Sequence, residues 1–114
     1  MLRMINPDFE FKDERGVIIQ LVHKGYNQFN LITSKKDVVR GNHYHKLNKE
    51  AFYVISGETE VEVNGEVFVF KAGNFFDIEP YDMHSFRYLS DTVLVSMYSM
   101  GVELPSGEKD IYVE

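Results

Sequence analysis

The sequence contains no cysteine and no long run of apolar residues. Without cysteine there is no disulfide framework, which is the usual support of a small secreted protein. The opening residues, MLRMINPDFEF, lack the apolar segment of a signal peptide. No stretch approaches the roughly 20 apolar residues that a membrane-crossing helix needs. We therefore expect a cytoplasmic protein with no membrane partner.

Positive charge is also scarce. The chain has 12 lysine and arginine residues against 18 aspartate and glutamate residues, which gives a formal net charge of −6. Surfaces that bind nucleic acids or anionic membranes need clustered lysine and arginine. The lysines here occur singly or as the pair Lys35-Lys36, so we expect no nucleic-acid partner.

The length and the apolar content are those of one small domain. The chain has 114 residues, 44% of them hydrophobic, with nine Phe and seven Tyr. A chain of this size buries roughly two-thirds of its unfolded surface in a single core. The sequence therefore predicts one domain over residues 1–114.

Apolar residues recur with the period of a strand and not with that of a helix. Residues 58–63 alternate glutamate with threonine or valine, which predicts a strand whose glutamates face solvent. Asn64-Gly65 follows directly, and both residues tolerate the positive φ of a type I′ hairpin turn. Short strands and turns recur about every eight to twelve residues, which predicts an all-β sandwich or barrel.

One internal segment is predicted to be covered, and the two ends of the chain are candidates for contacts between subunits. Val17 to Val22 is apolar at both odd and even positions, which predicts a strand covered on both faces. Residues 1–11 are interpreted as an edge strand or as an arm across a neighbouring subunit. The tail, Gly101 to Glu114, which closes with Asp110 to Val113, is a further candidate for pairing with another subunit. Because exchanged strands cover unpaired sheet edges, we expect a homodimer.

The stretch from Tyr26 to Thr33 has one polar face. Gln28 and Asn30 share that face with Ile32, since alternate residues of a strand point the same way. If this face lines the interior, Gln28 and Asn30 are candidates for ligand contacts. If the strand lies at an edge with this face outward, they contact only solvent. The sequence favours neither of the two possibilities.

Histidine is concentrated in one part of the chain. His43 and His45 are two residues apart, so on a strand they share a face. A loop over residues 46–49 then allows Glu50 to return beside them, and a later turn brings His84 as a fourth candidate. Nitrogen and oxygen donors of this kind suit zinc, iron, manganese or nickel better than calcium or magnesium. The pattern predicts one divalent transition metal, and His23 is interpreted as an ordinary, partly exposed side chain.

These residues resemble the motifs of the cupin superfamily. The first motif matches His43-x-His45-x4-Glu50-x6-Gly57, and the second matches Gly73, Pro80 and His84. The glycine that usually begins the first motif is replaced here by Asp37. The resemblance implies an all-β fold, a small cupin β-barrel (double-stranded β-helix or jelly roll), with His43, His45, Glu50 and His84 around one metal.

A second resemblance is to the cupins that act on sugar nucleotides. It rests on four short segments: Asp13-x-Arg15-Gly16, Gln28-x-Asn30, Ser34 and Arg40-Gly41-x-His43. The chain is similar to dTDP-4-dehydrorhamnose 3,5-epimerase, to the dTDP-sugar 3,4-ketoisomerases, and most of all to the C-terminal cupin of capsular-polysaccharide enzymes, which is associated with zinc. The resemblance implies an isomerase or epimerase that removes a proton next to a ketone.

Roles for individual residues follow from the second resemblance. Arg15 and Arg40 would hold the diphosphate of the substrate through paired N–H donors, with Gln28 and Asn30 as further substrate contacts. His43 would be the catalytic base, and Tyr98 is the candidate for the second catalytic group that moves the proton.

The two roles of His43 exclude each other, because a nitrogen lone pair that binds a metal cannot also accept a proton. With a metal bound, the ion would instead polarise the ketone as a Lewis acid. Two alternative functions are an iron- or manganese-dependent dioxygenase or decarboxylase of a small molecule, and a non-enzymatic cupin that binds a small molecule.

Overall fold

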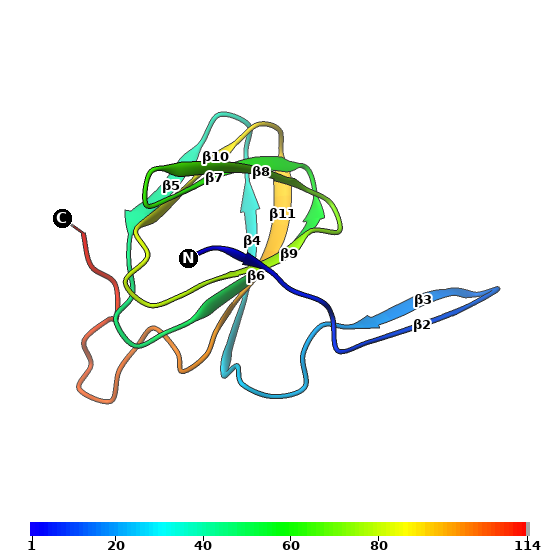
Figure 1. The fold of residues 1–114 in the computed structure, drawn as a ribbon, viewed down its shortest axis with the longest axis horizontal. Coiled ribbons are helices and arrows are strands. Elements are labelled where there is room, and N and C mark those ends of the chain that lie inside the picture. Colours follow the sequence, from blue (N-terminus) through cyan, green and yellow to red (C-terminus); the bar gives the residue numbers. More distant parts are fainter. Residues whose placement is uncertain (114) are drawn as a thin grey trace.

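The computed structural model describes residues 1–113 of the chain, and among these residues there are strands, turns and loops but no helix (Figure 1). No helix in this range is therefore long and apolar enough to cross a membrane. The strands are β1 (Arg3–Met4), β2 (Phe9–Asp13), β3 (Gly16–Gln20), β4 (Gln28–Ser34), β5 (Val39–His43), β6 (Glu50–Ser56), β7 (Glu58–Val63), β8 (Glu66–Lys71), β9 (Phe75–Ile78), β10 (His84–Tyr88) and β11 (Thr92–Tyr98).

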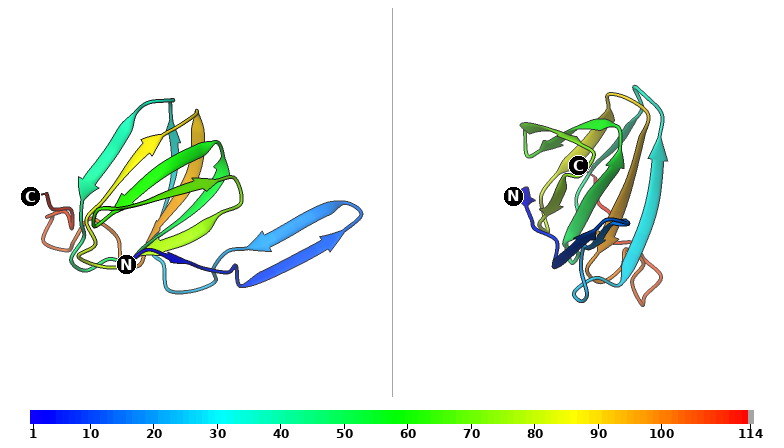
Figure 2. Two further views of the ribbon diagram at one scale, coloured as in Figure 1. Left: turned by 45° about the horizontal axis from the view of Figure 1, so that its top comes forward. Right: turned by 90° about the vertical axis from the view of Figure 1, so that its right-hand side faces the viewer.

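Two antiparallel sheets pack face to face and form the body of the molecule (Figure 2). One has the strand order β1-β9-β6-β11-β4, and the other has the order β5-β10-β7-β8. The buried core between them is rich in aromatic and branched side chains, which are Phe52, Val54, Val61, Val63, Phe70, Phe76, Ile78, Phe86, Tyr88 and Leu94. The predicted all-β jelly roll is confirmed.

The strand pair β7 and β8 follows the sequence pattern closely. Thr59, Val61 and Val63 are buried while Glu58 and Glu62 are exposed. The turn between the two strands has positive φ at both central residues, 50° at Asn64 and 85° at Gly65. This is the geometry of the predicted type I′ turn.

The hairpin of β2 and β3 projects away from the two sheets (Figure 1). The strand predicted over Val17 to Val22 to be covered on both faces ends at Gln20, and every residue of β3 is exposed. The prediction of two-sided burial is therefore wrong for the single chain, because β3 pairs only with β2. The apolar pattern indicates a segment suited to being covered, but no other part of residues 1–113 covers it.

Both ends of the described chain pack on the body. The short β1 pairs with the edge strand β9, in agreement with the interpretation of the first residues as an edge strand. The C-terminal segment pairs with its own chain, through a bridge between Tyr112 and Tyr44. Pairing of the tail with another subunit stays a prediction, since this bridge involves the backbone of Tyr112 alone.

Strand β4 presents its polar face to the interior. Gln28, Asn30 and Ile32 are half-buried, whereas Phe29 and Leu31 are 57% and 68% exposed on the opposite face. Of the two alternatives left open by the sequence, the structure therefore has the one in which the polar face of this strand points inward. Its consequence is an apolar outer surface on this edge of the larger sheet.

Candidate metal centre

Three histidines meet at one end of the space between the sheets. His43 ends β5 and His84 begins β10, and the register of these two strands places them opposite each other. His45 follows β5 after one residue, as alternation requires. The potential ligand nitrogens of His43, His45 and His84 all lie within 4.8 Å of one another, and His45 and His84 are buried. Imidazoles gathered at this distance could hold a metal ion.

Glu50 completes the cluster from the first position of β6. Its side chain is 4% exposed, and its Oε1 atom lies 3.0 Å from Nε2 of His45 and 3.5 Å from Nε2 of His84. The structure thus brings together all four residues that the spacing predicts as ligands. Three nitrogen donors and one carboxylate oxygen fit a divalent transition metal.

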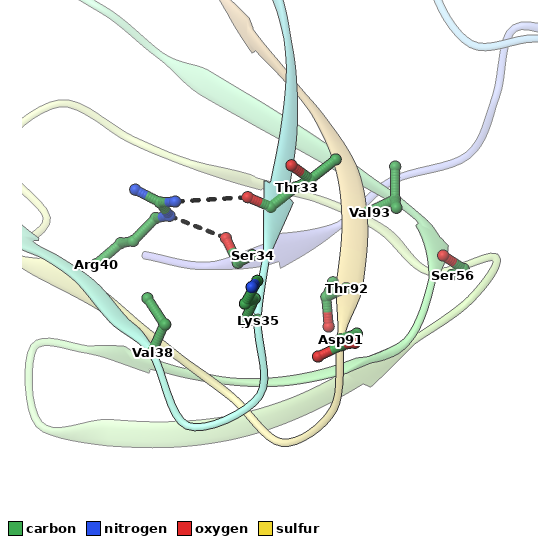
Figure 3. A pocket seen from close by; sticks show the side chains of 9 residues that line it. All are labelled: Thr33, Ser34, Lys35, Val38, Arg40, Ser56, Asp91, Thr92 and Val93. Carbon is green, nitrogen blue, oxygen red and sulfur yellow. Dashed lines mark hydrogen bonds between the residues drawn. The ribbon is translucent and has the colours of Figure 1, made fainter.

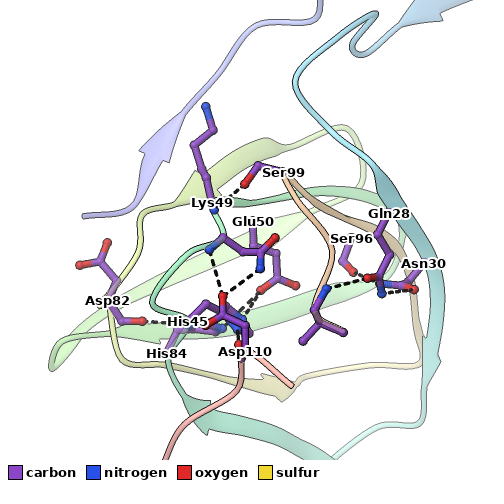
Figure 4. Close-up of polar contacts among 12 residues, drawn as sticks. Gln28, Asn30, His45, Lys49, Glu50, Asp82, His84, Ser96, Ser99 and Asp110 are labelled. Carbon is purple, nitrogen blue, oxygen red and sulfur yellow. Dashed lines mark hydrogen bonds and ion pairs between the residues drawn. The ribbon is translucent and has the colours of Figure 1, made fainter. Parts of the chain in front are cut away.

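The ring orientation of two histidines is set by backbone carbonyls (Figure 4). Nδ1 of His45 lies 2.6 Å from the carbonyl oxygen of Asp110, and Nδ1 of His84 lies 2.9 Å from that of Asp82. Because a carbonyl only accepts, each Nδ1 carries the hydrogen. The Nε2 atoms of both rings are thereby turned toward Glu50 and the centre of the cluster.

The cluster has a distinct protonation pattern. Burial, with the neighbouring His84 and His45, lowers the pKa of His43 to about 4. Burial also opposes the charged form of His45, but the hydrogen bond to Glu50, the negative charge of Glu50 and the hydrogen bond to the Asp110 carbonyl together outweigh it and raise the pKa of His45. Burial likewise opposes the charge on Glu50, but the hydrogen bonds from His45 and His84 lower the pKa of Glu50. At neutral pH, His43 is therefore neutral and Glu50 is a carboxylate.

A cavity of about 120 Å³ opens beside the cluster. Its lining combines apolar core side chains with ionisable ones and consists of Ile32, Arg40, His43, Glu50, Phe52, His84, Phe86, Tyr88, Leu94 and Tyr98. The Tyr98 ring packs edge-on against His45, with ring centroids 5.1 Å apart. Burial, followed by the negative charge of Glu50, raises the pKa of Tyr98 well above its ordinary value, so its hydroxyl stays protonated at neutral pH.

Arg40 lines both this cavity and a wider, open hollow of about 510 Å³, which is drawn in Figure 3. Its Nε donates to the hydroxyl of Ser34 at 2.9 Å, which holds the guanidinium between β4 and β5. The open hollow also has Lys35 and Asp91 in its lining but none of the histidines. Arg40 is thus placed to contact a ligand that extends out of the cavity.

The other predicted substrate contacts lie apart from the cavity. Arg15 sits at the tip of the β2–β3 hairpin, where its side chain is 80% exposed and pairs with Asp13. Gln28 accepts a hydrogen bond from the backbone of Val102 and donates to Asn30, and Asn30 donates to Ser96. The single chain therefore does not bring Arg15, Gln28 or Asn30 to the histidines, and their roles in binding stay predictions.

Three further positions deserve comparison with the sequence. His23 lies outside the cluster and pairs with Asp8, in agreement with its interpretation as an ordinary side chain. Asp37, at the place usually taken by glycine, has a φ of 72°, a left-handed conformation that aspartate tolerates better than most residues. Asp110 and its contacts with the cluster were not found from the sequence, because nothing near residue 45 indicates a partner 65 positions away.

The sequence model of the cupin domain matches residues 31–100. A search of curated protein sequences found no match. Among solved structures, a 3,4-ketoisomerase from Helicobacter canadensis is 18% identical with a TM-score of 0.80, and the similarity covers 99% of this chain and 90% of that one.

Two other solved structures show a similar fold. A dTDP-4-dehydrorhamnose 3,5-epimerase from Sulfolobus tokodaii is 22% identical with a TM-score of 0.69, over 85% of this chain and 69% of that one. The capsular polysaccharide assembling protein CapF from Staphylococcus aureus is 22% identical with a TM-score of 0.65, over 92% of this chain and 33% of that one. At these identities the likeness establishes the fold alone.

Proposed function

The chain belongs to the cupin domain family, and we propose that it is a metal-binding isomerase or epimerase that acts on a nucleotide-linked keto sugar. The observation that carries the proposal is the buried cluster of three histidines beside a cavity that a carboxylate, a phenol and a guanidinium also line. This is a set of groups able to bind a ketone, exchange a proton and bind an anion. The similarity in fold to an epimerase and a ketoisomerase of sugar nucleotides supports the substrate class.

The residues present fit a divalent transition metal, and zinc, iron, manganese and nickel are all compatible with the donor set. His43, His45, His84 and Glu50 would hold the ion. Bound there, it would supply Lewis acidity toward the oxygen of a ketone, which favours removal of a neighbouring proton.

His43 is assigned to the metal and not to proton abstraction. A general base works best when its pKa is near the working pH, whereas burial and two histidine neighbours lower the pKa of His43 to about 4. A neutral imidazole at physiological pH is, however, the form that a metal binds. The same environment that weakens His43 as a base therefore suits it as a ligand.

Tyr98 and Arg40 are assigned to the substrate. Because the phenol of Tyr98 stays protonated, it would donate a hydrogen bond to the substrate, and the proton next to the ketone would pass to water that enters from the open hollow. The cavity of about 120 Å³ is below the roughly 300 Å³ at which ordinary ligand pockets begin. Only the reacting part of a nucleotide-linked sugar would enter it, and the charged remainder would lie outward, along Arg40.

The test is proton exchange at the substrate. Metal-loaded protein is incubated with a panel of 4-keto sugar nucleotides in heavy water, and deuterium next to the ketone is followed by mass spectrometry and NMR. We expect exchange in the wild type and a strong loss in His84→Ala, with loss of bound metal. No exchange for any sugar nucleotide in the panel would count decisively against the proposal.

The same preparation separates the alternatives. Oxygen consumption that requires added ferrous iron would indicate a dioxygenase, and bound metal without turnover on any class of substrate would indicate a binding protein. Activity that persists without metal would return His43 to the role of base.

We also propose that the protein is a homodimer. Phe29 and Leu31 point outward from β4, and the projecting hairpin exposes Phe9, Phe11 and Ile18 by 53%, 46% and 65%. Apolar surface of this kind favours association. Light scattering should give twice the chain mass for the wild type, and Leu31→Asp should shift the mass toward that of one chain. A wild type with the mass of a single chain at micromolar concentration would refute the dimer.

A further inference from the structure

Residues 100–113 form a strap that follows β11 and folds back to the segment after β5 (Figure 1). The strap is closed on itself by a hydrogen bond from Asp110 N to Val102 O at 2.7 Å. It is tied to the body through the two backbone hydrogen bonds between Tyr112 and Tyr44, at 2.9 and 3.0 Å. The match to the cupin domain ends at residue 100, where the strap begins. Beyond its first residue, the strap thus lies outside the residues that match the cupin domain.

The carboxylate of Asp110 is the anchor of the strap. The residue is fully buried, and its two oxygens accept hydrogen bonds from the backbone N–H groups of Lys46, Leu47 and Asn48 at 2.9, 3.0 and 3.1 Å. The side-chain amide of Asn48 donates a further bond at 2.8 Å. Removal of such an acceptor leaves buried N–H donors without partners, which is unfavourable wherever water cannot reach them.

The bonds made by this carboxylate fix the loop between two of the metal-cluster residues. His45 immediately precedes the loop and Glu50 follows it after Lys49. Asn48, itself fully buried, also accepts from the backbone N–H groups of Met100 and Gly101 at 2.9 Å. The loop is thus held by the strap from two directions.

The backbone of Asp110 acts on His45 directly. Its carbonyl oxygen lies 2.6 Å from Nδ1 of His45, so this nitrogen is the donor and Nε2 is left to face Glu50 and the other histidines (Figure 4). The hydrogen bond to the distal nitrogen of a ligating histidine fixes its tautomer and ring orientation, and loss of such a partner typically weakens metal binding about 10–100-fold.

We propose that Asp110 is a positioning residue that holds His45 ready for the ion, with its side chain fixing the loop and its main chain fixing the ring. The inference rests on the metal-binding part of the proposed function. It gives the strap a role in metal affinity, although no residue of the strap contributes a ligand.

The test compares Asp110→Ala and Asp110→Asn with Lys109→Ala, a change of an exposed neighbour in the same strap. The dissociation constants for zinc and cobalt are measured by competition with a chromophoric chelator. We expect affinity to fall about 10–100-fold in Asp110→Ala, less in Asp110→Asn, whose amide oxygen keeps part of the bonds, and not at all in Lys109→Ala.

A second measurement, on the metal-free protein, reports on the hydrogen bonding of the His45 imidazole. Nitrogen-15 NMR of the imidazoles should show the Nδ1–H of His45 hydrogen-bonded and protected from exchange with water in the wild type, and this protection should be lost in Asp110→Ala. Unchanged affinity together with an unchanged His45 signal would overturn the proposal, since Asp110 would then support the fold only. If Asp110→Ala does not fold, Asp110→Asn decides by the same two measurements.

The two measurements also separate this inference from the proposed function. If the wild type binds neither ion, the metal-binding proposal fails, and the His45 signal in the variants still decides whether Asp110 sets the ring.

Discussion

The turn between β6 and β7 should not tolerate a side chain at Gly57, and the cost of adding one can be worked out from its surroundings. A Cβ at this position would lie 2.4 Å from the carbonyl oxygen of Asp91, 2.5 Å from Oγ1 of Thr92 and 2.7 Å from its Cα, at a φ of +91°. Two of these atoms belong to the backbone, so the clash cannot be relieved by turning a side chain. Both the backbone conformation and the steric contact therefore oppose Gly57→Ala.

Gly73 provides the matched control. It has a φ of +90° and nothing within 4 Å of the added Cβ, so Gly73→Ala carries the conformational cost alone. That cost is about 1–2 kcal/mol, and overpacking typically adds about 1–3 kcal/mol. We expect Gly73→Ala to lose about 1–2 kcal/mol of unfolding free energy and Gly57→Ala about 2–5 kcal/mol. The gain from restricting the unfolded chain is common to both variants and cancels in the comparison.

Equilibrium unfolding in urea is the assay, with the two variants compared at equal m-values so that midpoints report stability. Equal losses in the two variants would refute the reasoning, because the contacts with Asp91 and Thr92 would then be free to relax. A loss of metal binding in folded Gly57→Ala would also contradict it, since Gly57 does not line the cavity beside the histidines.

Three further predictions concern the site. Glu50→Gln should fold but bind metal more weakly, because the amide keeps the shape and loses the charge; chelator competition measures the change, and wild-type affinity would exclude Glu50 as a ligand. Tyr98→Phe should keep metal affinity while slowing deuterium return to the substrate, and an unchanged rate would remove Tyr98 from the mechanism. In metal-free protein, stability should fall as the pH drops from about 6.5 toward 4, because the unfolded state protonates His43 near the ordinary pKa while the folded state resists until about 4. Urea midpoints across this range should therefore change less in His43→Gln, and equal slopes would contradict the assignment.

Local sequence signals predicted the strands and the cluster because the physics behind them is local. The alternation over residues 58–63 and the Asn64-Gly65 turn depend on neighbours in the chain, and the structure has both. The two-residue spacing of His43 and His45 places them on one face for the same reason. The turn before His84 made it a candidate, the family resemblance placed it with the other two, and the register of β5 with β10 supplies the geometry.

The predictions that failed depend on contacts between distant segments. The apolar residues of β3 indicate that the segment is suited to being covered, but the sequence does not say by what. The role of Asp110 depends on hydrogen bonds to residues 46–48, more than sixty positions earlier in the chain. Nothing in the sequence around an aspartate in a loop indicates a hydrogen-bond partner so far away. Arg15 shows a different limit of the sequence. The motif match predicted its residue type and its role, but the match does not say where the side chain lies relative to the histidines.

The wide separation of the site residues along the chain has a consequence for how the protein acquires its fold. The cluster draws on residues 43 to 84 and the strap on residue 110, so the complete site is absent until long-range strand pairing has taken place. An ion that binds only this finished arrangement would stabilise it by mass action, by about 2.7 kcal/mol at a hundredfold excess over the dissociation constant. The yield of folded chains would then depend on the supply of metal while the protein is being made.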